Sequence, residues 1–268
     1  MDGSQHVTAD KAIEGAKAKV AKSDPNLRPR DAATLIILDT SNGPTRILFG
    51  KRRMDQKFMP GKYVFPGGRV DPTDLRVKTG ETLAPTEVQK LLRDIKGRPS
   101  ERRVNAFALA AVRETYEETG LLLGAKTPTP GTSTTPIWQK FFGHGVAPRL
   151  SSITFLARAI TPPGKPRRYD TRFFCVRAED IAHKTSDSDG ELTETHWLTL
   201  DEAKTFDLPT IQRAILEDLS DRLKQEGHLG PSAHPVPFYH MRNGTFRRDL
   251  LTVGGTAAHV IGEDRLGA

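Results

Sequence analysis

Residues 113–121 read Arg-Glu-Thr-Tyr-Glu-Glu-Thr-Gly-Leu, and they end a predicted helix that begins near Glu101. Because a helix turns about 100° per residue, Glu114, Glu117 and Glu118 share an arc of about 100° on its surface. Like charges four residues apart destabilise a helix, and the carboxyl end of a helix disfavours anions. Arg113 alone cannot neutralise three carboxylates, so a hard divalent cation, Mg²⁺ or Mn²⁺, is the expected complement. A solvated acidic helix end is the alternative interpretation.

Apolar patterns predict the elements around this helix. Phe107, Ala111 and Val112 lie on one helical face, and Gly120 supplies the residue at which the helix stops. Apolar runs bounded by turn residues predict strands, and apolar residues at helical spacing predict helices. The predicted strands are 33–38, 45–50, 121–123, 153–160, 172–176 and 192–200, and further helices are predicted at 86–95, 201–206 and 210–225.

The acidic segment matches a known pattern. It resembles the second half of the Nudix box, R-E-U-x-E-E-x-G-U, with Thr115 in the aliphatic position. Gly68 and Asp74 match the first half, G-x5-E, with aspartate in place of glutamate. Asp74 and Arg113 are 39 residues apart, where the family pattern has 8, so an insertion over about residues 75–105 splits the box.

The sequence upstream of the box resembles one subgroup of that family. Residues 65–68 read Phe-Pro-Gly-Gly, and Leu48, Arg52 and Gly61 stand at the spacings of the coenzyme A diphosphatase pattern, with Lys57 replacing its second arginine. The chain is therefore similar to the split-box Nudix hydrolases, the peroxisomal acyl-CoA/CoA diphosphatase type and its bacterial relatives.

The resemblance covers about residues 32–223 and implies a fold and a domain division. The expected fold is the α/β Nudix fold, an α/β/α sandwich with a mixed β-sheet and a loop-helix-loop metal platform. Residues 1–30 are expected to form a partly disordered arm, 31–226 the Nudix domain with its insertion, and 227–268 a C-terminal extension packed on that domain.

The resemblance also implies an activity and roles for the box residues. The expected reaction is metal-dependent cleavage of the pyrophosphate bond of a nucleoside diphosphate linked to another moiety, with coenzyme A or acyl-CoA as the first substrate. The alternatives are an ADP-ribose, dinucleotide or nucleotide-sugar diphosphatase, or a noncatalytic nucleotide-sensing module. The implied metal ligands are Glu114, Glu117, Glu118 and the carbonyl of Gly68, and Arg113 would orient the glutamates.

A general base must accept a proton from the attacking water. In this family the base is a glutamate either of the box helix, here Glu114 or Glu118, or of a distal loop. Glu191, in the acidic stretch 187–194, is the first loop candidate and Glu194 the second, with a solvated acidic turn as the alternative.

Clustered basic residues indicate where an anionic substrate would bind. The candidates are Arg52 and Lys57 in one cluster and Arg168 and Arg172 in another, since arginine at a strand start can bind phosphate with two N–H groups. A pairing of Arg172 with Asp170 or another acid is the alternative.

Length, charge and cysteine content limit the remaining classes. The chain has 268 residues, a formal net charge of +7 and one cysteine, Cys175, which is expected to be a buried small hydrophobe. Its longest apolar run, 106–112, has seven residues against the roughly 20 that cross a bilayer, and its first residues contain no apolar signal segment. We therefore expect a cytoplasmic protein with a nucleotide-type substrate and no membrane partner. Nucleic acid is not expected, because no aromatic-interleaved basic motif is present, and a homodimer is an open alternative.

Overall fold

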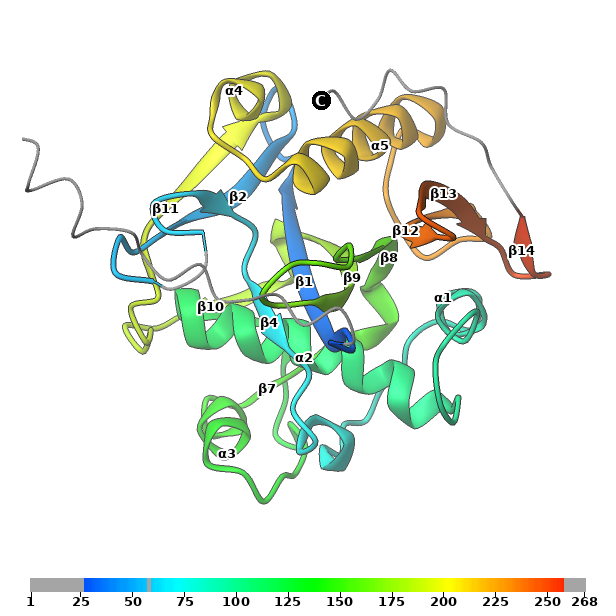
Figure 1. Cartoon of the computed structure of the whole chain (residues 1–268). Coiled ribbons are helices and arrows are strands. Elements are labelled where there is room, and N and C mark those ends of the chain that lie inside the picture. Colours follow the sequence, from blue (N-terminus) through cyan, green and yellow to red (C-terminus); the bar gives the residue numbers. More distant parts are fainter. Residues whose placement is uncertain (1–26, 57–58, 258–268) are drawn as a thin grey trace, which may run out of the picture.

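The computed structural model describes residues 27–56 and 59–257 (Figure 1). Most of the predicted N-terminal arm, and Lys57, lie outside the described residues. The strands are β1 Arg30–Asp39, β2 Arg46–Arg52, β3 Tyr63–Val64, β4 Gly67–Arg69, β5 Leu121–Leu123, β6 Ala125–Lys126, β7 Val146–Ala147, β8 Thr154–Ile160, β9 Tyr169–Arg177, β10 Ile181–Lys184, β11 Leu192–Thr199, β12 Val236–Arg242, β13 Thr245–Leu251 and β14 Thr256–Ala257. The α-helices are α1 Pro85–Leu91, α2 Glu101–Thr119, α3 Pro136–Gly143, α4 Leu200–Thr205 and α5 Thr210–Glu226, and short 3-10 helices are η2 Asp74–Arg76, η3 Leu150–Ser152 and η4 Ala178–Asp180.

A large mixed sheet forms the centre of the molecule. Its strand order is β11-β2-β1-β9-β8-β12-β13-β14, with β3 paired to β2 and β4 paired to β1. Strand β1 runs parallel to β9 and antiparallel to β2 and β4. The central part of β1 is apolar on both faces, as expected for a strand that is covered on both sides.

Helices cover both faces of this sheet. Successive side chains of a strand point to opposite faces, so Leu35 and Ile37 pack in one hydrophobic cluster and Ile36 and Leu38 in another. The first cluster includes α2 and α3, and the second includes α4 and α5. Figure 1 shows α2 below the sheet and α4 and α5 above it. The predicted α/β/α sandwich with a mixed sheet is thus confirmed.

Capping residues determine where α2 begins and ends. The hydroxyl of Ser100 accepts a hydrogen bond from the Arg103 N–H, which satisfies one of the unpaired donors of the first turn. Gly120 ends the helix in the left-handed conformation, with φ 72°. The helix therefore spans the predicted residues, and its acidic end directly precedes β5. The other predicted strands and helices are also present, with ends that differ by a few residues.

The C-terminal extension differs from the expectation of a segment packed on the domain. Up to residue 257 it enters the sheet, because β12 pairs in parallel with β8 and in antiparallel fashion with β13. Pro237 lies inside β12, and a proline normally argues against a strand. The pairing of β12 with β8 joins segments about 80 residues apart, which local sequence patterns do not reveal.

The insertion contributes α1, and a buried ion pair ties that helix to the extension. Glu87 and Lys90 are both fully buried, and Lys90 Nζ lies 2.9 Å from Glu87 Oε1. Lys90 also donates to the carbonyls of Ser232 and His234, at 2.9 and 3.3 Å. Glu87 accepts from the backbone N–H groups of Phe155 and Ser232. The insertion helix therefore braces the extension against β8.

No helix within the described ranges combines the length and apolar character that crossing a bilayer requires.

Candidate active site

The Gly-Gly pair of β4 lies against the acidic end of α2. Strand β4 pairs with β1, with Thr34 opposite Gly67 and Ala33 opposite Gly68. The Gly67 N–H donates to Glu118 Oε2 at 2.9 Å. A Cβ atom on Gly68 would lie 2.4 Å from Glu114 Cδ, so any other residue here would force this carboxylate to move. The two separate sequence segments thus form one structural unit.

Asp74 and Arg113 join the two halves of the split pattern. Arg113 Nε and Nη2 donate to the two oxygens of Asp74 at 2.9 and 3.0 Å, in a bidentate ion pair. Asp74 is almost fully buried and also accepts from the indole N–H of Trp138 and the N–H of Asp71. The insertion therefore leaves this contact in place. Trp138 has no sequence signal that would have linked it to the site.

Arg113 also holds two of the glutamates. Its Nη1 donates to Glu114 Oε1 at 2.9 Å and to Glu117 Oε2 at 2.6 Å, and its Nη2 donates to the Arg69 carbonyl. These are the contacts that the predicted orienting role requires. Asp74 holds the guanidinium from the other side, and the orienting role of Arg113 stays a prediction.

Burial and like charges perturb the carboxylates of α2. Burial raises the pKa of Glu118 well above its usual range; the Gly67 N–H opposes this, and Glu114 and Glu191 raise the pKa further. Burial likewise raises the pKa of Glu114 to about 7, with Arg113 acting in the opposite direction. Ionised glutamates in this position are costly without additional positive charge, and perturbed groups of this kind often mark functional sites.

The acidic stretch before β11 lies beside the carboxyl end of α2. Glu191 Oε1 lies 2.6 Å from Arg52 Nη2, and the Asp189 N–H donates to the Glu117 carbonyl at 2.7 Å. Glu194, in contrast, is exposed and pairs with His196 at 3.0 Å. The structure therefore brings Arg52 and Glu191 to the end of α2 and favours Glu191 over Glu194 as the loop candidate.

Comparisons with known proteins agree with this geometry. No family model matches the chain. It is 30% identical over 182 residues to a Caenorhabditis elegans protein that carries the provisional name nudix hydrolase 7, an alignment of 63% of this chain and 51% of that protein. It is 26% identical over 212 residues to the acyl-coenzyme A diphosphatase NUDT19 of Gallus gallus, an alignment of 59% of this chain and 54% of that protein. The crystal structure of a NUDIX hydrolase from Alicyclobacillus acidocaldarius superposes with a TM-score of 0.52 at 23% identity, over 77% of this chain and 99% of that chain.

The chain has the Nudix fold. The similarity is to Nudix hydrolases, although the chain spans about half the length of the curated relatives that it matches. Helix α2 carries the second half of the split pattern, and Gly67 and Gly68 of β4 belong to its first half.

The carboxylates around the end of α2 have the donor chemistry of a divalent-cation site. At full ionisation these carboxylates outnumber the guanidinium groups there by three, since five carboxylates, of Asp74, Glu114, Glu117, Glu118 and Glu191, face the guanidinium groups of Arg52 and Arg113. In the described part of the chain no three His, Cys, Asp or Glu side chains already converge as a metal-binding group. Glu114 and Glu117 instead contact Arg113, and Glu118 contacts Gly67. The excess negative charge and the glycine cradle fit a hard cation, and ligation requires these carboxylates to turn toward one another.

The structure corrects the prediction for Arg172. Its side chain is 1% exposed, and it pairs with Asp31 at 2.7 Å and with Asp170 at 3.4 Å. The guanidinium also lies over the Phe107 ring, 4.1 Å from the centroid. Arg172 is therefore not placed to contact a substrate, and the alternative interpretation as an ion-pair partner holds.

Arg168 is likewise engaged by the chain itself. Its Nε donates to the Thr161 carbonyl at 3.0 Å and its Nη1 to the Leu27 carbonyl at 2.7 Å. Arg168 and Arg172 thus both bind groups of the chain itself, and the Arg168 contacts lie next to the ends of β8 and β1. Lys57 lies outside the described residues, and Arg52 is the predicted substrate-binding residue that the structure places at the box.

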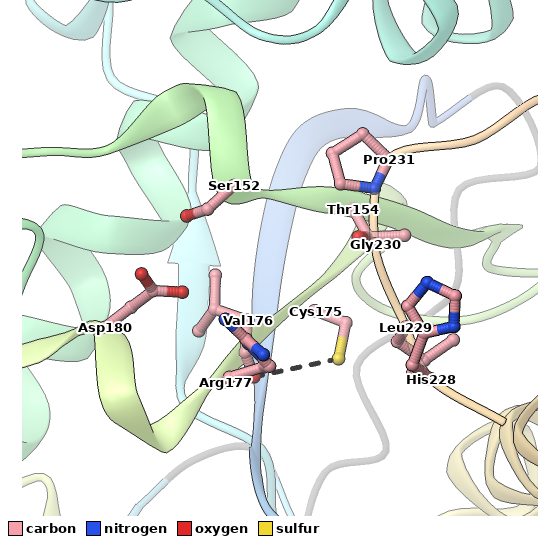
Figure 2. A pocket seen from close by; sticks show the side chains of 10 residues that line it. All are labelled: Ser152, Thr154, Cys175, Val176, Arg177, Asp180, His228, Leu229, Gly230 and Pro231. Carbon is pink, nitrogen blue, oxygen red and sulfur yellow. Dashed lines mark hydrogen bonds between the residues drawn. The ribbon is translucent and has the colours of Figure 1, made fainter.

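A separate pocket contains none of the predicted site residues (Figure 2). Strands β8 and β9 and the segment after α5 line it, and Cys175 lies on β9. Burial raises the pKa of Cys175 to about 12, so the group remains a protonated thiol at neutral pH. The prediction that Cys175 is a buried small hydrophobe is confirmed.

Proposed function

We propose that this chain is a divalent-metal-dependent Nudix hydrolase, which cleaves the pyrophosphate bond of a nucleoside diphosphate linked to another moiety. The observation that carries the proposal is the contact between Gly67 and Gly68 of β4 and the glutamates of α2. Glu114, Glu117, Glu118 and the Gly68 carbonyl would hold the cation. When bound, such a cation neutralises phosphate charge and makes a coordinated water acidic enough to attack phosphorus.

The protein's own groups supply orientation and proton transfer. Arg113, fixed by Asp74, contacts both Glu114 and Glu117 and is the residue that we propose orients them. Glu191 is the proposed general base, with Glu114 and Glu118 as the alternatives on the helix. Arg52 holds Glu191 at 2.6 Å and also carries N–H donors suited to a phosphate. A substrate phosphate would therefore share Arg52 with Glu191.

Coenzyme A or an acyl-CoA is the first substrate that we propose. The support is the 26% identity to the chicken acyl-coenzyme A diphosphatase and the spacing of Arg52 before the Phe-Pro-Gly-Gly segment. Other linked nucleoside diphosphates, and binding without cleavage, are outcomes that the following experiment distinguishes.

Purified protein would be incubated with Mg²⁺ or Mn²⁺ and with coenzyme A, an acyl-CoA, ADP-ribose, NADH, diadenosine polyphosphates and nucleotide sugars, with products identified by mass. Metal-dependent release of 3′,5′-ADP and 4′-phosphopantetheine is the expected result for coenzyme A. Cleavage of a different compound alone would keep the hydrolase and change the substrate. Tight nucleotide binding without cleavage of any compound would overturn the proposed hydrolase.

Gly68→Ala is expected to lower kcat by about 10- to 100-fold. The new methyl group would lie 2.4 Å from Glu114 Cδ and displace that carboxylate from the box. Steady-state kinetics at saturating Mg²⁺ would measure the effect. Gly80→Ala is the matched control, because a Cβ on Gly80 meets no atom within 4 Å. Equal activity of the two variants would contradict the role of Gly68 as a cradle for Glu114.

A further inference from the structure

The loop between β10 and β11 is fastened to the carboxyl end of α2. The last carbonyls of a helix have no donor within the helix. Two of them find donors in this loop: the Thr185 N–H donates to the Gly120 carbonyl at 2.9 Å, and the Asp189 N–H donates to the Glu117 carbonyl at 2.7 Å. The loop therefore acts as a cap on α2 at the box glutamates.

Asp187 lies between these two attachment points and contacts α2 and the α3 region. Its Oδ2 lies 3.3 Å from Lys140 Nζ and 3.7 Å from His144 Nε2. The Tyr116 hydroxyl lies 3.5 Å from the same oxygen and 3.2 Å from His144 Nε2. Lys140 belongs to α3, His144 follows it, and Tyr116 belongs to α2. One carboxylate thus receives groups from two other elements.

The part of the loop that carries Asp187 leads directly to Glu191. The Asp187 N–H donates to Thr185 Oγ1 at 3.2 Å, and the Glu191 N–H donates to Asp189 Oδ1 at 2.8 Å. Glu191 then pairs with Arg52. Asp187 and Asp189 are joined through the backbone alone, and the Asp189 N–H is bonded to the Glu117 carbonyl. Because only four residues separate Asp187 from Glu191, a change at Asp187 is expected to reach Glu191 through this short segment.

We infer that Asp187 is a positioning residue that locks the loop Thr185–Glu191 onto α2 and α3. It holds Glu191 against Arg52 and beside the box glutamates. Its effect on turnover rests on the proposed function, whereas its effect on the loop does not. Neither Asp187 nor its partners Lys140, His144 and Tyr116 is a predicted metal ligand or substrate contact.

Hydrogen exchange of the intact protein tests the loop directly. In Asp187→Ala the amides of residues 185–191 are expected to exchange about tenfold faster or more, while those in the middle of α2 keep their wild-type rates. Asp201→Asn is the matched control, since Asp201 is an exposed acid that pairs with Lys204 at 2.6 Å on α4. Unchanged exchange of the loop in Asp187→Ala would overturn the inference.

Kinetics test whether the loop matters for turnover. Asp187→Ala is expected to lower kcat about tenfold with KM within about twofold, because Glu191 is displaced while the substrate contacts remain. Asp187→Asn keeps an acceptor for Tyr116 and should fall between Asp187→Ala and the wild type. In a Lys140→Met background the effect of Asp187→Asn on kcat should shrink, since the two residues act as a pair.

A raised KM with unchanged kcat would overturn the positioning role. Wild-type protein that cleaves none of the tested compounds would overturn the proposed function instead, and loop exchange would still decide the inference.

Discussion

Glu118→Gln is expected to lower kcat/KM for the proposed hydrolysis by about a thousandfold or more and to leave the fold intact. The glutamine carbonyl can still accept the hydrogen bond from the Gly67 N–H, which now ends on Glu118 Oε2. It cannot supply negative charge to a cation. Because Glu118 is 3% exposed and close to Glu114, a neutral amide also removes an unfavourable buried charge. The melting temperature at fixed pH should therefore equal or exceed that of the wild type.

Steady-state kinetics with Mg²⁺ and Mn²⁺, together with thermal unfolding, would check both parts of this prediction. Glu101→Gln is the matched control, because Glu101 is an exposed glutamate in the first turn of the same helix. Its loss should reduce stability by about 0.3–1 kcal/mol through the helix dipole and leave kcat unchanged. Wild-type turnover by Glu118→Gln would mean that the end of α2 is not the metal platform.

The elements of the fold were predictable where a local pattern determines them. The apolar run of β1 predicts a strand covered on both faces, and the interval from Ser100 to Gly120 contains both the start and the stop of α2. The spacing of the box glutamates predicts that they share one end of that helix. These inferences need only the geometry of a single element.

Partners that are distant in the sequence and lie outside the family pattern were not predictable. Arg172 belongs to a basic cluster in the sequence, yet its partner Asp31 is 141 residues away and comes beside it only through the parallel pairing of β1 with β9. Trp138 donates to Asp74 across 64 residues, with no motif at either end. The sheet position of β12 depends likewise on β8. Apolar periodicity therefore predicted the helices and strands well. Charge clusters in the sequence were a poorer guide to which side chains contact each other.

The fold around the insertion is expected to be strongly destabilised by the loss of one buried charge. Glu87→Ala, or Lys90→Ala, should lower the free energy of unfolding by about 3–5 kcal/mol, because each leaves its former partner as an unpaired charge in the interior. Both side chains are 0% exposed. Urea denaturation followed by circular dichroism would measure the change. Lys204→Ala is the matched control, because Lys204 and Asp201 form an exposed pair at the same three-residue spacing. That control should lose at most about 1 kcal/mol, and an equally small loss in Lys90→Ala would contradict the prediction.

The double variant Glu87→Leu with Lys90→Met separates the ion pair from the hydrogen bonds around it. Replacing a buried ion pair with apolar residues of similar size is often close to neutral. Here the double replacement should remain destabilising, because Lys90 also donates hydrogen bonds to the carbonyls of Ser232 and His234. Glu87 in turn accepts hydrogen bonds from the N–H groups of Phe155 and Ser232. Each backbone group left buried without a partner costs about 1–3 kcal/mol. Faster hydrogen exchange in β12 and in the segment around Ser232, with the β1 and β9 amides unchanged, would place the loss at the junction between the insertion and the extension. A double variant as stable as the wild type would show that apolar packing alone holds this junction.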